Sequence, residues 1–116
     1  MIKPMIGANL WIWESPVTTA VIRELAPRVK AMGFDANELP LENVDDWSPD
    51  EVCPILEAHG LVAGVCAAMG PGRDLTSLDA QVVADTQAYL RACVHHAAGI
   101  GATVVAGPIY LSLIHI

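Results

Sequence analysis

A carboxylate near the end of a short predicted strand is the side chain of this sequence best placed to do chemistry. Glu38 lies in the segment 34–39, which fits an extended strand, and Gly33 before it supplies the left-handed residue that ends a helix. Parallel α/β sheets present their ligand-binding groups at the carboxyl ends of the strands. We therefore expect Glu38 at a strand tip, where a carboxylate can accept hydrogen bonds or move a proton. The alternative is a solvated rim carboxylate beside Asn37.

A thiol and an indole lie at the ends of two other apolar segments. Cys66 is close to the end of 61–67, and Trp13 ends 6–13. No histidine or basic residue lies within a few positions of Cys66 to lower its pKa, which argues against a nucleophilic role. Cys66 is interpreted as pocket lining or as an ordinary buried thiol. Trp13 is interpreted as a pocket wall or as core packing.

Apolar segments alternate with helical patterns in an order typical of a parallel α/β sheet. We expect strands at 6–13, 34–39, 61–67 and 102–107. Amphipathic spacing predicts helices over about 21–32, 49–59 and 79–98. Pro27 falls inside the first helical pattern and predicts a kink or a late helix start. Ser48 and Pro49 are typical of an N-cap and first helical position, with Glu51 placed for a capping box.

Composition limits the class of protein and its partners. The 116 residues suit one small domain, and 53% apolar content with a mean hydropathy of +0.44 suits a core on both sheet faces. A net charge of -7 with six scattered basic residues argues against nucleic acid as a partner. No apolar run approaches the ~18 residues of a membrane span. Three cysteines without a CxxC pair and no leader-like start predict free thiols and a cytoplasmic protein.

The sequence offers no complete metal site. His95 and His96 are adjacent on a predicted helix, so their side chains point about 100° apart and cannot share one inward-facing metal. A zinc site with Cys93 is the alternative to solvated histidines, which we favour. The acidic residues between 42 and 51 lack EF-hand spacing and are interpreted as a solvated loop and helix cap.

Two architectures fit this order of elements. One is an open, doubly wound sheet, and the other is the first half of an eight-stranded barrel. Gly7, Ala63 and Gly64 are small residues within predicted strands, where barrel interiors and close backbone approaches use them. This observation favours the barrel.

Three segments resemble a known superfamily: AMGFDANEL (31–39), LVAGVCA (61–67) and GATVVAG (101–107). They are similar to the amino-terminal half of the xylose isomerase-like TIM barrels, the sugar phosphate isomerases and epimerases. Within it, the chain most resembles ketose 3-epimerases of the D-tagatose and D-psicose (allulose) type. The resemblance implies a partial (β/α)8 TIM barrel over residues 1–110, with its first four strands and three helices. Residues 111–116 do not resemble the family and are interpreted as a non-native tail.

The resemblance also implies a chemistry and its limits. Such enzymes use a divalent metal, Mn, Co or Mg, held by two glutamates, an aspartate and a histidine on later strands that have no counterpart here. We therefore expect a fragment of a metal-dependent sugar isomerase or epimerase that acts by proton transfer next to a carbonyl. The fragment is expected to lack catalytic and metal-binding residues, to be inactive and, because its edge strands are open, to associate. At full length, a homo-oligomer with a sugar substrate is expected.

Five positions match substrate contacts of that family. They are Trp13, Glu38, Cys66, Pro108 and Tyr110. Asn9 stands where the family often carries an aromatic residue, which bears on substrate preference.

Two alternative functions stay open from the sequence. One is another superfamily member, such as an inosose dehydratase or a hydroxypyruvate isomerase, and the other is a small, non-catalytic, doubly wound binding module.

Overall fold

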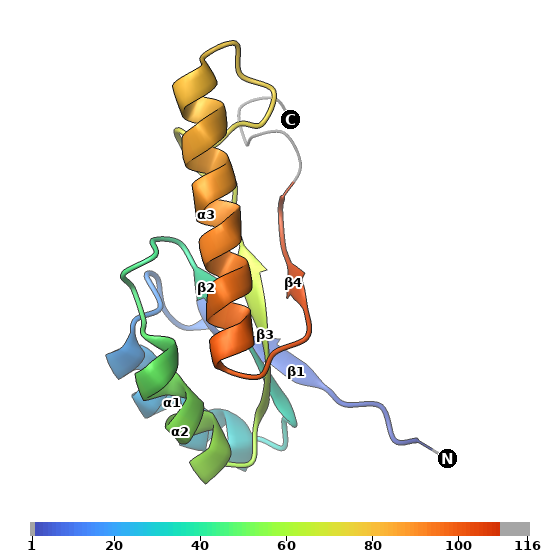
Figure 1. Ribbon diagram of the computed structural model, residues 1–116. Helices are drawn as coiled ribbons and strands as arrows, with labels where there is room; N and C mark the ends of the chain where they lie inside the picture. Colours follow the sequence, from blue (N-terminus) through green and yellow to red (C-terminus); the bar gives the residue numbers. More distant parts are fainter. Residues whose placement is uncertain (1, 110–116) are drawn as a thin grey trace.

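The computed structural model describes residues 2–109, which form a four-stranded parallel sheet with three α-helices (Figure 1). The elements in chain order are β1 (Gly7–Asn9), the 3-10 helix η1 (Leu10–Ile12), α1 (Thr19–Ala31), β2 (Ala36–Leu41), α2 (Pro49–Ala58), β3 (Val62–Ala67), α3 (Ala80–Gly99) and β4 (Val105–Ala106). The predicted alternation of four strands and three helices is confirmed. None of the helices within 2–109 is long and apolar enough to cross a membrane.

The strands lie in the order β1-β2-β3-β4, and this order decides the architecture. Because the order never reverses, each right-handed crossover places its helix on the same side of the sheet. Figure 1 shows α1, α2 and α3 gathered on that side. A doubly wound sheet instead reverses its strand order and carries helices on both faces. The partial (β/α)8 barrel predicted from the sequence is therefore confirmed.

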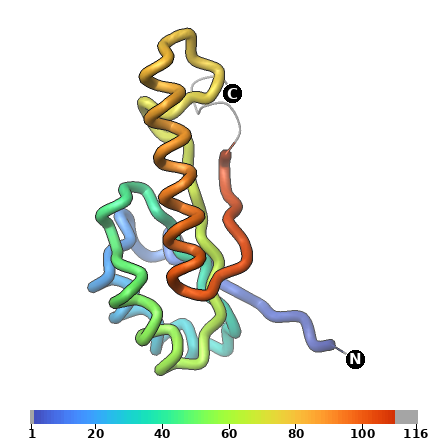
Figure 2. Tube along the Cα trace, viewed as in Figure 1, coloured from blue at the N-terminus to red at the C-terminus, as the bar shows by residue number. Residues whose placement is uncertain are grey.

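The core lies between the three helices and the sheet face that they cover. Alternate strand residues, including Ala8, Leu39 and Val65, face the helices and are buried. They pack with Ile22 of α1 and other buried helix residues. The opposite face carries no helix among residues 2–109, as expected for four strands of a barrel that is not closed. The stretch 2–6 leads away from the body and is exposed (Figure 2).

The first strand is shorter than its apolar sequence predicts. The strand ends at Asn9, whose side chain accepts a hydrogen bond of 2.9 Å from the Trp11 backbone N–H. This hydrogen bond makes Asn9 the N-cap of η1, so the chain turns into a 3-10 helix at Leu10. Trp13 consequently lies at the C-cap of η1 rather than at a strand end.

The second strand begins and ends two residues later than predicted. β2 runs over Ala36–Leu41, so Glu38 lies in the middle of the strand, level with Asn9 and Gly64, and not at its tip. Pro40 does not end the strand, and its carbonyl accepts a hydrogen bond of 2.9 Å from Trp47 Nε1. The residue that directly follows β2 is Glu42.

The helix starts follow the sequence signals in part. α1 runs from Thr19 straight through Pro27, so a late start is wrong, and Thr18 accepts a capping hydrogen bond from the Val21 N–H. Ser48 is the N-cap of α2, as predicted, but its side chain makes no capping hydrogen bond. The predicted capping box is therefore not formed by the Ser48 hydroxyl. Gly33 has φ +97°, which confirms the left-handed residue at the end of α1.

Candidate functional site

Three polar side chains converge on the open face of the sheet. Asn9 of β1 and Glu38 of β2 are paired in register, and Cys66 lies two residues beyond Gly64, the β3 partner of Glu38. Side chains two residues apart on a strand share a face, so all three project away from the helices. In a closed barrel this face is the interior.

Cys66 is a neutral thiol in this cluster. Burial, followed by the negative charge of Glu38, raises the pKa of Cys66 to about 11, although a hydrogen bond from Asn9 acts in the opposite direction. The side chain is 3% exposed, and its Sγ lies 3.9 Å from the Ala67 carbonyl oxygen. Because the thiolate is the nucleophilic form, Cys66 can line a binding site but is poorly suited to attack a substrate.

A second carboxylate, Glu42, lies at the true end of β2 and holds the β1–α1 connection. Its Oε1 accepts hydrogen bonds from Trp11 Nε1 at 2.6 Å and from Ser15 Oγ at 2.5 Å. Glu42 was predicted to lie in a solvated acidic loop, and its contacts with Trp11 and Ser15 were not predicted. If the strand had been predicted to end at Leu41, Glu42 would have been the first residue beyond it. That position would have indicated a functional or structural role for its carboxylate.

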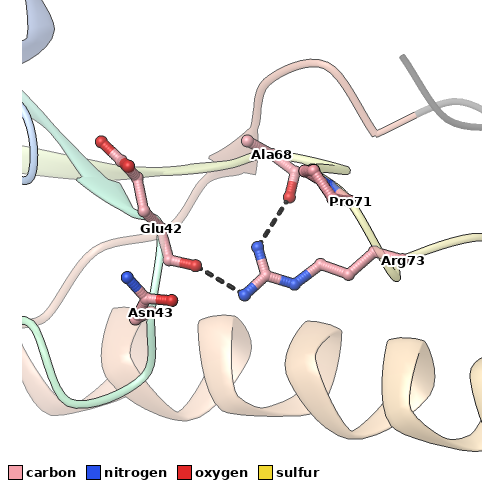
Figure 3. A pocket seen from close by; sticks show the side chains of 6 residues that line it. Glu42, Asn43, Ala68, Pro71 and Arg73 are labelled. Atoms are coloured by element: carbon pink, nitrogen blue, oxygen red, sulfur yellow. Dashed lines mark hydrogen bonds between the residues drawn. The ribbon is translucent and has the colours of Figure 1, made fainter. Parts of the chain in front are cut away.

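Arg73 joins the carboxyl ends of β2 and β3 (Figure 3). Its guanidinium donates to the Glu42 carbonyl at 2.5 Å and to the Ala68 carbonyl at 3.1 Å. It also lies 3.5 Å from the centroid of the Tyr89 ring, a cation–π contact. In Figure 3 the Glu42 carboxylate points away from Arg73, so the arginine engages the backbone and leaves that carboxylate to Trp11 and Ser15.

An open pocket of about 310 Å³ lies beside this arginine. It is lined by Glu42, Asn43, Ala68, Gly70, Pro71 and Arg73 (Figure 3). Both connections that form it follow the carboxyl ends of strands, the location at which barrel enzymes build their sites. Because the Arg73 guanidinium already donates hydrogen bonds to two backbone carbonyls, we interpret Arg73 as a residue that shapes the pocket.

Tyr89 of α3 makes the same link between strands from the helix side. Its hydroxyl donates to the Leu41 carbonyl at 2.6 Å and accepts from the Ala68 N–H at 2.9 Å. Burial raises the pKa of Tyr89 to about 12, so the hydroxyl keeps its proton at neutral pH. The carboxyl ends of β2 and β3 are therefore held at a fixed separation.

The structure brings some of the predicted site residues together and leaves others apart. Glu38 and Cys66 are neighbours on the open face. Pro108 is half-buried beside the end of β3, where its carbonyl accepts a hydrogen bond of 3.2 Å from the Met69 N–H. Trp13 is half-buried and packs against the core, while Trp11 contacts the strand-end carboxylate. Tyr110 and the tail 111–116 lie outside the described residues.

The residues present do not fit a divalent metal. Within 2–109, no group of three or more His, Cys, Asp or Glu side chains could hold an ion. His96 is not a solvated histidine as predicted. Its Nδ1 lies 2.9 Å from the Ala92 carbonyl, its Nε2 lies 3.1 Å from the Val44 carbonyl, and its ring packs edge-on against Trp47. His95 is exposed, as expected.

Known proteins that are similar in sequence and in fold to this chain are sugar 3-epimerases. No protein-family model matches the chain. The chain is 28% identical over 108 residues to a ketose 3-epimerase from Arthrobacter globiformis, which covers 93% of this chain and 37% of that protein. A D-allulose 3-epimerase from Methylomonas sp., solved with D-allulose, superposes with a TM-score of 0.86 and 22% identity over 94% of this chain and 38% of its own. An L-ribulose 3-epimerase superposes with a TM-score of 0.84 and 18% identity over 95% and 37%.

The chain thus spans about two fifths of the length of the proteins that it matches. Their shared part is the four-stranded, three-helix portion of the barrel described above. The resemblance to ketose 3-epimerases predicted from the segments around Glu38, Cys66 and β4 is confirmed: this chain is similar to one part of a ketose 3-epimerase, and its fold matches one part of the solved 3-epimerase structures.

Proposed function

We propose that this chain is the sugar-contacting part of a ketose 3-epimerase-like isomerase. The observation that carries the proposal is the convergence of Asn9, Glu38 and Cys66 on the open face of a partial barrel. Barrel enzymes bind their substrates near the carboxyl ends of such strands. The similarity to a ketose 3-epimerase and the D-allulose held by a similar structure favour a ketose as the ligand class.

Each residue of this site has a distinct role in the proposal. The Glu38 carboxylate accepts hydrogen bonds from substrate hydroxyls, and the neutral Cys66 thiol gives an uncharged surface beside them. Trp13 and Pro108 form walls of the binding site, and Tyr110, which lies outside the described residues, is proposed as a further substrate contact. Aromatic rings suit this task because they are large and largely apolar.

The chain by itself is proposed not to complete the reaction. Inverting a carbon next to a carbonyl needs one group to remove the proton and another to return it on the opposite face. Glu38 is the only charged residue within the described strands, so it cannot serve both faces. The second group and the ligands of an Mn, Co or Mg ion would come from residues outside this chain.

Ketose binding tests the proposal. In ¹H–¹⁵N spectra of the 116-residue chain titrated with D-allulose, we expect the amide signals of Asn9, Glu38 and Cys66 to shift. Glu38→Gln should weaken binding several-fold, because a neutral amide accepts weaker hydrogen bonds than a carboxylate. Glu57→Gln on the exposed surface of α2 is the matched control and should bind as the unaltered chain does. Shifts confined to the helix surfaces, or none at all, would contradict the proposal.

Turnover is a separate test. We expect no epimerisation of D-allulose by the purified chain with added Mn²⁺, as followed by chromatography of the sugars. Metal-dependent conversion by the chain alone would show that its own residues suffice and would refute the division of labour proposed here.

A further inference from the structure

Both edges of the described sheet are unpaired, and both run in the same direction. Within residues 2–109, β1 pairs only with β2, and β4 only with β3, each in parallel. Val65 pairs with Val105 and donates to the Val104 carbonyl at 3.0 Å. In a parallel ladder, the N–H and C=O of Val105 itself then point to the outer edge. Exposed edges of this kind are templates for another strand.

The open face beside these edges is apolar where it is exposed. Val62 of β3 is 48% exposed and Val104, two residues before Ala106, is 55% exposed. By strand alternation both lie on the same face as Cys66. Unburied apolar side chains on this face, next to the free edge of β4, indicate a surface that associates.

The distribution of charge selects which face can meet a second copy. The net charge is -7, so two copies repel each other in general. The strand residues contribute only the Glu38 carboxylate, whereas α2 alone carries Asp50, Glu51 and Glu57. Contact through the open face therefore brings together the fewest charged side chains, one carboxylate per copy, and it keeps the nine charged residues of the three helices on the outside.

We propose that two copies of this chain close one eight-stranded parallel barrel, with β4 of each copy paired to β1 of the other. A two-fold axis along the strands preserves strand direction, so both new pairs are parallel. Two sheets of four give eight strands, the number that closes a barrel with an interior filled by side chains. The two-fold arrangement leaves no free edge, which makes the assembly finite. The open faces of both copies form the interior.

Light scattering after size exclusion tests this assembly. The unaltered chain should have about twice the mass of one chain, 12.3 kDa. Val104→Lys places a charge on the open face and should convert the dimer to monomer. Val94→Lys is the matched control, because Val94 is 58% exposed on α3, on the outside of the proposed barrel, and should leave the dimer intact. Val62→Lys repeats the open-face test on a different strand.

Each outcome decides the proposal. Circular dichroism of the lysine variants should match the unaltered chain, so that a lost dimer reports the interface rather than unfolding. If one open-face variant unfolds, the other provides the comparison. A monomeric unaltered chain would overturn the proposal and leave a complementary half barrel as the occupant of this face. Larger, open assemblies would overturn it too, since edge pairing without closure forms filaments. Dissociation by Val94→Lys would place the contact on the helices.

Discussion

At the scale of single residues, the negative charge of Glu38 acts on the Cys66 thiol across the β2–β3 ladder. Burial and the neighbouring carboxylate both favour the neutral thiol, so the pKa of Cys66 rises from 9.0 to about 11. A raised folded-state pKa stabilises the fold fully below pH 9, and that contribution is lost as the pH rises through about 11. The site thus contains a carboxylate that accepts hydrogen bonds, Glu38, and beside it a protonated and therefore unreactive thiol, Cys66.

Glu38→Gln should lower the pKa of Cys66, because it removes the second largest cause of the shift. We expect the pH at which the ¹³Cβ signal of Cys66 titrates in NMR spectra to move down from about 11 towards, but not to, 9.0, since burial persists. A residue-resolved signal is needed because Cys66 is too buried for a thiol reagent to reach it in the folded chain. Glu51→Gln, on the exposed surface of α2, serves as the control. An unchanged titration of Cys66 in Glu38→Gln would show that the two side chains are not neighbours.

Asn37 is a polar residue buried in the helix-covered core. It is 1% exposed, and within the described residues neither its Oδ1 nor its Nδ2 has a hydrogen-bond partner. Asn37→Leu should raise the free energy of unfolding by about 1–3 kcal/mol, since an unpaired buried amide is replaced by an apolar group of similar size. Urea denaturation measures this change. Asn43→Leu, at an exposed position, should give no such gain, and a loss of stability in Asn37→Leu would mean that the amide has a partner.

At the scale of elements, β4 is held close to β3 by a glycine. Gly107 has φ +122°, and a Cβ built there would lie 2.2 Å from the Ala67 carbonyl oxygen. Gly107→Ala should therefore cost at least about 1–3 kcal/mol of stability and loosen β4. Hydrogen exchange of the Val65 amide, which donates to Val104, reports that loosening. Gly70→Ala is the control, because its Cβ would meet nothing within 4 Å. Equal effects at both glycines would argue against close docking of β4.

The ends of β2 and β3 depend on one hydroxyl of α3. Tyr89→Phe keeps the ring but leaves the Leu41 carbonyl and the Ala68 N–H without their partner. We expect a loss of about 1–3 kcal/mol in the free energy of unfolding, measured by thermal or urea denaturation. A neutral substitution would show that this hydroxyl does not tie the two strands together.

Hydrophobic periodicity and glycine stops predict the order and type of the elements in this chain, but not their ends. The end of β1 depends on the Asn9 cap, and β2 passes through Pro40, a residue that usually marks a strand end. Both errors moved the predicted site. Glu38 was predicted two residues too far along the strand, and Glu42 was predicted to lie in the loop. The contacts of Arg73 and Tyr89 join residues distant in sequence, so no local pattern indicates them.

At the scale of the whole molecule, the sheet of residues 2–109 is covered on one face and unpaired at both edges, and this explains the other observations. The three helices contain nine of the chain's 19 charged residues and the described strands contain one, while exposed side chains on the open side, such as Val62 and Val104, are apolar. Such a surface suits the interior of a barrel and not solvent. A second copy and a complementary half barrel would use the same two edges, so each should compete with the other.

Co-expression with the missing part of a relative is the most direct test of this account. The partner would be the remainder of the Arthrobacter globiformis ketose 3-epimerase, beyond the 37% that this chain matches, and the control is that remainder with its own first part. The account predicts that the hybrid pair epimerises a ketose and that neither part does so alone. A control pair that is active, beside a hybrid pair that assembles but leaves the sugar unchanged, would contradict the assignment of this chain as the sugar-contacting wall.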